Sequence, residues 1–217
     1  MLGKLLKYEW KATGRVILPI YGALLIFALM TRLLMFADSR TGSALSHSLL
    51  GGLLSGIIML CYGFLVVAVC VITVVILVQR FYKNLLGDEG YLMHTLPVKP
   101  WMNLTVKTIT AMIWCILSGC MSIFSVMVMA ITPRDIVQFF PALGDFIATF
   151  TQRFGAQGWL LGLEGGIMLL IMLAAYILAA YTAMVLGHMF GSHKVFWSIL
   201  IYAAICTLAN VATVPYY

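Results

Sequence analysis

The sequence predicts an all-α fold, a polytopic transmembrane helical bundle with five or six spans. Of its 217 residues, 63% are hydrophobic and only 9% are charged, whereas soluble domains carry about 45–50% apolar and about 25% charged residues. Five apolar stretches are each long enough for a hydrocarbon core about 30 Å thick. No stretch shows the alternation that is typical of a barrel strand. This composition disfavours a soluble enzyme, a disordered chain and a nucleic-acid-binding domain.

The five apolar stretches are the predicted spans of a single transmembrane domain that covers residues 1–217. The second and the fourth are long enough to form helices of ~45 Å, which must tilt or protrude from the bilayer. The stretches cover residues 16–36, 49–78, 106–132, 159–187 and 195–214.

Residues 1–15 have an amphipathic pattern of their own. Apolar side chains that include Leu5 and Trp10 share one helical face, and Lys4, Lys7 and Lys11 share another. The pattern predicts an interfacial helix on an anionic cytoplasmic surface. The alternative is a plain basic flank that only sets the orientation.

The distribution of Lys and Arg predicts a cell-membrane protein with a cytoplasmic N-terminus. With this orientation, nine basic residues lie in cytoplasmic segments and four lie at the outer side. The nine are Lys4, Lys7, Lys11, Arg15, Arg80, Lys83, Lys99, Lys107 and Lys194, and the four are Arg32, Arg40, Arg134 and Arg153. Residues 133–158 then form an external segment, whose clustered apolar residues predict a surface-seeking or partly re-entrant helix.

We find no motif for catalysis or metal binding in the sequence. It contains no GxxxxGK[ST], no GxSxG and no HExxH pattern, so we expect no catalytic residue, no metal site and no cofactor in this chain. His188 and His193 are too far apart in sequence to stack on one helical face as an i, i+4 pair would.

Three polar residues in or near the predicted spans are candidates for a substrate path. Glu164 is the only carboxylate inside an apolar stretch, and an ionisable residue in the membrane suggests a functional site. It lies near the predicted outer edge, however, and hydration there or pairing with Arg32 would also account for it. For Asn210, an interhelical hydrogen bond is the favoured role.

Small residues recur at four-residue spacing in two of the spans. Gly52 and Gly56 form one GxxxG pattern, and Gly162 and Gly166 form another. Such pairs let helices approach closely. Packing within one subunit and packing at a subunit interface both remain open.

The loop over residues 79–105 holds the most specific pattern. Its turn, with Asp88 and Glu89, is able to cap a short helix that Pro97 ends. A short half-apolar helix suits docking into a groove on a soluble partner, and the alternative is a loop that packs on its own spans. The loop resembles that of ABC-2-type transporter permeases, whose pattern runs approximately E-G-[TY]-L-x-x-x-L-P-V. The matching residues are Glu89, Gly90, Tyr91, Leu92, Leu96, Pro97 and Val98.

This resemblance, which residues 1–15 share, implies the permease subunit of an ATP-driven exporter. The family works with a separate cytoplasmic P-loop ATPase, which binds ATP and Mg, and with a second permease copy, identical or related. The loop from Asp88 to Val98 would then be the coupling helix that contacts the ATPase. Such permeases usually have six spans, so a shortened chain and a re-entrant element in 133–158 both remain open. The rival interpretations are a non-transporting membrane scaffold that keeps the docking loop and an intramembrane enzyme.

Overall fold

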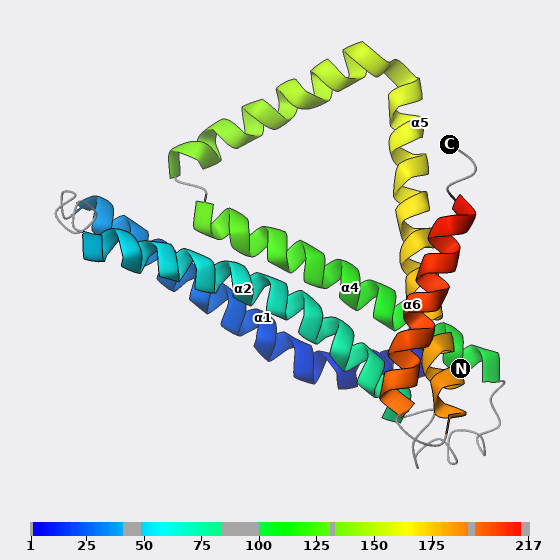
Figure 1. The fold of residues 1–217 in the computed structure, drawn as a ribbon. Coiled ribbons are helices and arrows are strands. Elements are labelled where there is room, and N and C mark those ends of the chain that lie inside the picture. Colours follow the sequence, from blue (N-terminus) through cyan, green and yellow to red (C-terminus); the bar gives the residue numbers. More distant parts are fainter. Residues whose placement is uncertain (1, 41–48, 84–99, 131–132, 191–193, 214–217) are drawn as a thin grey trace. The chain divides into compact units, whose positions relative to one another are not determined.

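A computed structural model describes residues 2–40, 49–83, 100–130, 133–190 and 194–213. These residues form long α-helices, and five of them are long and apolar enough to cross a membrane. The prediction of an all-helical fold is therefore confirmed, and the chain is a polytopic helical membrane protein. The helices are α1 (Leu2–Arg40), α2 (Leu49–Phe81), α4 (Pro100–Ala130), α5 (Pro133–His188) and α6 (Lys194–Thr213) (Figure 1).

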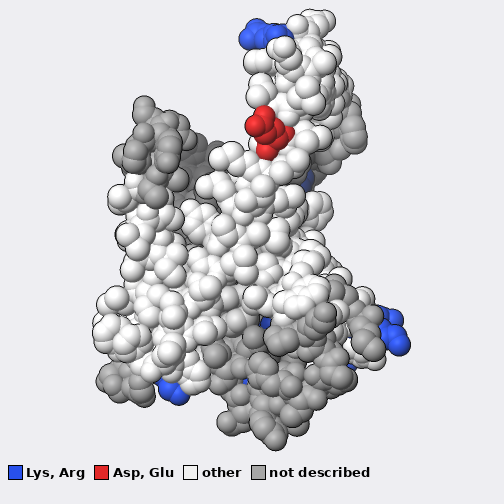
Figure 2. All heavy atoms as spheres, turned by 90° about the vertical axis from the view of Figure 1, so that its right-hand side faces the viewer, with Lys and Arg blue, Asp and Glu red and all other residues white. Residues whose placement is uncertain are grey.

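The surface of these helices is that of a protein surrounded by lipid. Large apolar side chains such as Phe64 on α2 (75% exposed) and Leu169 on α5 (69% exposed) point away from the protein. In the space-filling view, charged groups occupy only small areas of the described surface (Figure 2). A water-soluble monomer rarely exposes apolar patches of this extent, whereas lipid tails cover them without penalty.

The N-terminal amphipathic segment and the first predicted span form one continuous helix. α1 continues without a break through residue 15, although that is where the predicted interfacial helix ends. Within this segment Lys4, Lys7 and Lys11 are exposed, and Leu5 and Leu6 are half-buried, as the amphipathic pattern predicts.

The described residues group into two compact units. The first unit draws its residues from Met1–Thr13, Val74–Trp114 and Ile167–Tyr217, and the second from Gly14–Thr73 and Cys115–Gly166. The first contains the beginning of α1 together with the end of α2 and the start of α4, which precede and follow residues 84–99 in the sequence.

In the second unit, a seam of hydrogen bonds joins α2 to α4. Along α4 the seam uses Ser118, Ser122 and Ser125, all buried and all on one helical face. Their partners on α2 are Thr73 at 3.2 Å, Cys70 at 3.5 Å and Tyr62 at 2.9 Å, in that order.

The direction of two of these hydrogen bonds follows from the single proton of each hydroxyl group. Ser125 donates its proton to the carbonyl oxygen of Ser122, so Tyr62 is the donor to Ser125. Thr73 donates to the carbonyl oxygen of Val69, so Ser118 is the donor to Thr73. Each of these hydroxyl protons therefore has an acceptor inside the protein, in a region where water would not supply one.

α5 consists of two helices joined at Gly155. This residue has φ 56° and ψ −150°, a positive φ that favours glycine, and the bend is visible in Figure 1. Aromatic rings pack against one another on both sides of the bend. The ring centroid of Phe150 lies 5.1 Å from that of Phe154 and 5.5 Å from that of Trp159. At Gly158, an added Cβ would collide with Cβ of Phe154 and lie 3.1 Å from the Phe150 ring.

We predict that Gly158→Ala destabilises the protein, because the colliding Phe154 atom is attached to the backbone and has little freedom to move. Overpacking of this kind costs about 1–3 kcal/mol. Thermal unfolding of the purified protein in detergent measures the effect. Gly165→Ala is the matched control, because nothing lies within 4 Å of its added Cβ. Equal melting temperatures for the two variants would contradict the predicted overpacking.

Candidate functional site

The predicted docking loop lies outside the described residues. This applies to Asp88, Glu89, Gly90, Tyr91, Leu92, Leu96, Pro97 and Val98. Their role in binding an ATPase stays a prediction from the sequence.

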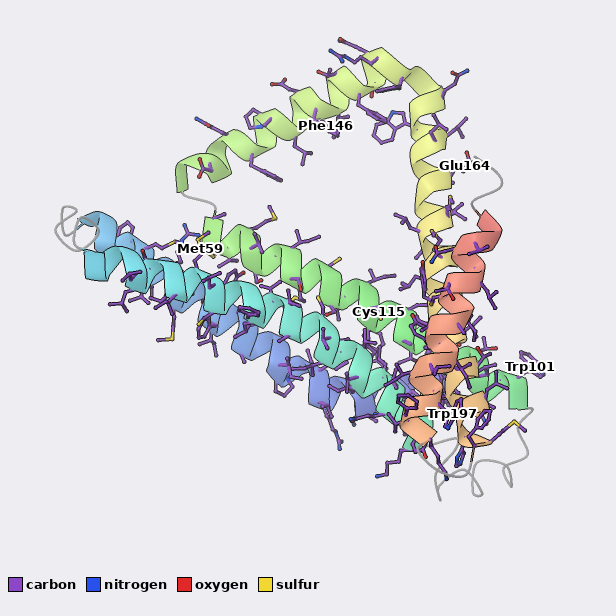
Figure 3. The ribbon with its side chains drawn as sticks, viewed as in Figure 1. Met59, Trp101, Cys115, Phe146, Glu164 and Trp197 are labelled. Atoms are coloured by element: carbon purple, nitrogen blue, oxygen red, sulfur yellow. The ribbon has the colours of Figure 1, made fainter. Side chains whose placement is uncertain are left out.

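Arg32 and Glu164 do not contact each other in the part of the chain that the structure describes. Nη1 of Arg32 instead donates a hydrogen bond to the carbonyl oxygen of Val128, which ties α1 to α4 in the second unit. Glu164 is exposed on the part of α5 after the bend (Figure 3), and no described residue gives it a hydrogen bond or an ion pair. A role for Glu164 in a substrate path remains a prediction.

The remaining polar and small-residue candidates are on exposed helix surfaces. Asn210 donates to the carbonyl oxygen of Cys206, one turn earlier in α6, at 2.9 Å. An added Cβ at Gly56, Gly162 or Gly166 would meet nothing within 4 Å, and Gly52 is exposed as well. The two GxxxG patterns therefore bring no helices together among the described residues, and a role at a subunit interface remains a prediction.

The first unit contains a cluster of charged side chains that sequence reasoning missed. Oε2 of Glu9 accepts a hydrogen bond from Nε of Arg80 at 2.9 Å, and Oε1 accepts one from Nζ of Lys107 at 3.1 Å. These three residues, the Glu9 cluster, are mostly shielded: their side chains are 14%, 25% and 6% exposed, in that order. One carboxylate thus holds two cations, and the cluster carries one net positive charge.

Each member of the Glu9 cluster comes from a different helix. Glu9 lies in the first turns of α1, Arg80 in the last turn of α2, and Lys107 near the start of α4. Arg80 and Lys107 therefore stand on either side of residues 84–99 in the sequence, and both are held by α1.

A small hollow adjoins the charges. Its volume of about 10 Å³ is that of about one water molecule, so it is too small to hold a substrate. The hollow is lined by Glu9, Thr13, Leu77, Arg80, Phe81, Lys107, Thr110 and Tyr181.

Two aromatic pairs pack the same helix ends. Trp10 of α1 stacks on Trp114 of α4, with ring centroids 4.8 Å apart. Phe81 of α2 stacks on Tyr181 of α5 at 3.8 Å and nearly parallel, at 6°. Phe81 and Tyr181 belong to a small buried cluster with Met184. The charges thus lie beside packed aromatic side chains and are largely shielded from water, which strengthens their attraction.

The Glu9 cluster connects three helices. Within the described ranges, no group of three His, Cys, Asp or Glu is arranged to bind a metal ion. The sequence contained one signal that we did not use. Glu9 is the only acidic residue before Asp38, and it lies among several lysines.

Comparison of the chain with protein-family models, with curated proteins and with solved structures gives no match. The function therefore has to be argued from the residues themselves.

We predict that Glu9→Gln destabilises the protein, because Arg80 and Lys107 would both lose the carboxylate that they share. Removing one partner of a shielded ion pair costs about 3–5 kcal/mol, and the partial exposure of Arg80 places the effect toward the lower end. The measurement is thermal unfolding in detergent. Lys11→Gln, on an exposed position of the same helix, is the control for a changed charge.

A double variant separates charge from packing. Glu9→Gln with Lys107→Met removes the carboxylate together with the most buried cation, so we expect it to be more stable than Glu9→Gln alone. If the double variant were less stable than the single one, unpaired charge would not explain the loss.

Proposed function

We propose that the chain is the membrane-spanning permease subunit of an ATP-driven ABC-2-type exporter, energised by a separate cytoplasmic ATPase. The motif from Glu89 to Val98 suggests the partner. The observation that carries the proposal is the Glu9 cluster, because it ties together the two helix ends between which this motif lies.

The cluster supplies a route for force from the ATPase. An ATPase that moves residues 84–99 acts on the end of α2 through Arg80 and on the start of α4 through Lys107. Both side chains are bound to the same carboxylate, so α1 must follow. A shared, shielded ion pair is suited to this role because breaking either of its contacts is costly.

The charges also suggest an orientation. Lys4, Lys7 and Lys11 are exposed on the same turns of α1 that carry Glu9. A basic surface of this kind favours the cytoplasmic leaflet, with its anionic lipids. The N-terminus, the Glu9 cluster and the motif would then all be cytoplasmic, where ATP is available.

In the proposed complex, two copies of the permease contribute to one transport path. The hollow at the Glu9 cluster has room for about one water molecule, so the substrate would pass elsewhere. Glu164 and the uncovered Gly162 and Gly166 lie on an exposed stretch of α5. A second copy packed against this stretch would cover the glycines.

We predict that a P-loop ATPase copurifies with the tagged chain from membranes in mild detergent. Glu89→Ala combined with Leu92→Asp should remove the ATPase, because the variant replaces both the charge and the apolar contact of the docking motif. Membrane insertion should stay unchanged. The measurement is the ATPase activity and the band stoichiometry of the purified sample.

Asn84→Ala is the matched control, since it changes the same loop outside the motif. Retention of the ATPase by the double variant would remove the docking role of Glu89 and Leu92. A wild-type chain that purifies without any ATPase would contradict the permease assignment and favour the membrane scaffold.

A further inference from the structure

The first helix of α5, residues 133–154, has an uncovered apolar face. Its large apolar side chains recur every three or four residues, so they share one side of the helix. Those exposed to more than a third of their surface are Phe139, Leu143, Phe146, Ile147 and Phe154, and Phe146 is the most exposed at 69%. We call residues 133–154 the arm of α5.

The opposite face of the arm is polar. Gln138, Asp145, Thr149 and Gln152 follow the same helical spacing and are all exposed. The arm is therefore amphipathic along most of its length. α5 continues after Gly155 into the apolar stretch 159–187, so the end of the arm is joined directly to this stretch (Figure 3).

Neither water nor the hydrocarbon core suits both faces of the arm. In water, the row of phenylalanine and leucine side chains would stay uncovered, which a soluble surface rarely tolerates. The arm is ~33 Å long at 1.5 Å per residue, long enough to cross the core. Crossing would bury Asp145, at a cost of about 2.5–3.5 kcal/mol near the centre, together with Gln138 and Gln152.

The bend at Gly155 turns the arm away from the direction of the span. The positive φ of Gly155 produces the bend, and the ring of Phe150, before the bend, contacts the ring of Trp159, after it. Trp159 itself is half-exposed at the beginning of the apolar stretch, and tryptophan at this place is typical of the membrane–water interface.

We propose that the arm of α5 is an interfacial membrane-binding helix. It lies in the bilayer surface, with the face of Phe139, Leu143 and Phe146 in the acyl chains and the face of Asp145 and Gln152 in the headgroups. This assignment is independent of the exporter proposal, because it depends only on the arm and its bend.

The arm binds lipid through apolar contact and not through charge. Arg134 and Arg153 are balanced by Asp135 and Asp145, so the arm has no net charge. Binding should therefore need no anionic lipid. The N-terminal turns of α1 differ in this respect, because Lys4, Lys7 and Lys11 outnumber Glu9 there.

Spin labels on the two faces test the proposal in the full-length chain. In a cysteine-free background, Phe146→Cys labels the apolar face and Asp145→Cys, its neighbour in sequence, labels the polar face. The protein is reconstituted into phosphatidylcholine vesicles. Power saturation then compares collisions with oxygen, which concentrates in lipid, and with a water-soluble nickel chelate.

We expect the ratio of oxygen to nickel accessibility to be severalfold higher at position 146 than at position 145. Replacing part of the phosphatidylcholine by phosphatidylglycerol should leave the ratio at position 146 unchanged, because Phe146→Cys keeps the arm without net charge. Leu143→Cys and Gln152→Cys form a second pair that keeps the test decisive if either first variant misfolds.

Three results would overturn the proposal. Nickel access at both positions would place the arm in water. Oxygen access without nickel access at both would show that the arm spans the bilayer. A ratio at position 146 that rises severalfold with phosphatidylglycerol would show that charge drives the binding.

Discussion

A polar group that enters the hydrocarbon must find its partner inside the protein, and this constraint explains most of the observed structure. Backbone groups meet it by forming long helices. Hydroxyl groups meet it by pairing between α2 and α4, as Tyr62 does with Ser125. The guanidinium group of Arg32 meets it by bonding the carbonyl oxygen of Val128. Lipid cannot supply these partners, so the polar side chains of this seam and Arg32 act as specific contacts between helices, whereas others, such as Asn210, bond a carbonyl oxygen of their own helix.

In the Glu9 cluster, fully charged groups likewise find their partners inside the protein. One carboxylate compensates two cations from two other helices, so the positions of three helix ends depend on a single side chain. The stacked pairs Trp10–Trp114 and Phe81–Tyr181 then keep water away. An arrangement of this kind resists the separation of the helix ends and lets them move as one body. The proposed permease subunit would require this property if an external ATPase moved its helix ends.

α5 differs from these polar contacts, because its most prominent feature is its exposed apolar surface. Its arm and its later turns expose apolar side chains that no described residue covers, and the bend at Gly155 separates two orientations of the same helix. The arm has both a polar and an apolar face, whereas the stretch around Leu169 is apolar on all sides. Amphipathic pattern and uniform hydrophobicity thus assign the two parts to different depths of the bilayer.

The sequence alone determined the fold class and the positions of the spans. In lipid, a helix needs about twenty apolar residues and little else, so local composition predicts it; the predicted stretch 49–78 lies within α2. The same local reasoning identified the amphipathic pattern of residues 1–15 and the apolar cluster of the arm. It also identified the predicted docking motif, whose residues lie outside the described part of the chain.

Only the tertiary structure decided which polar groups meet. Glu9 is 71 positions from Arg80 and 98 from Lys107, and no local pattern records such distances. Pairing of Arg32 with Glu164 was one of the alternatives that the sequence left open, and Arg32 instead bonds a backbone carbonyl group on α4. A pairing of this kind depends on which faces of the helices pack together. Hydropathy contains no information about these faces, because lipid rewards every apolar side of a helix equally.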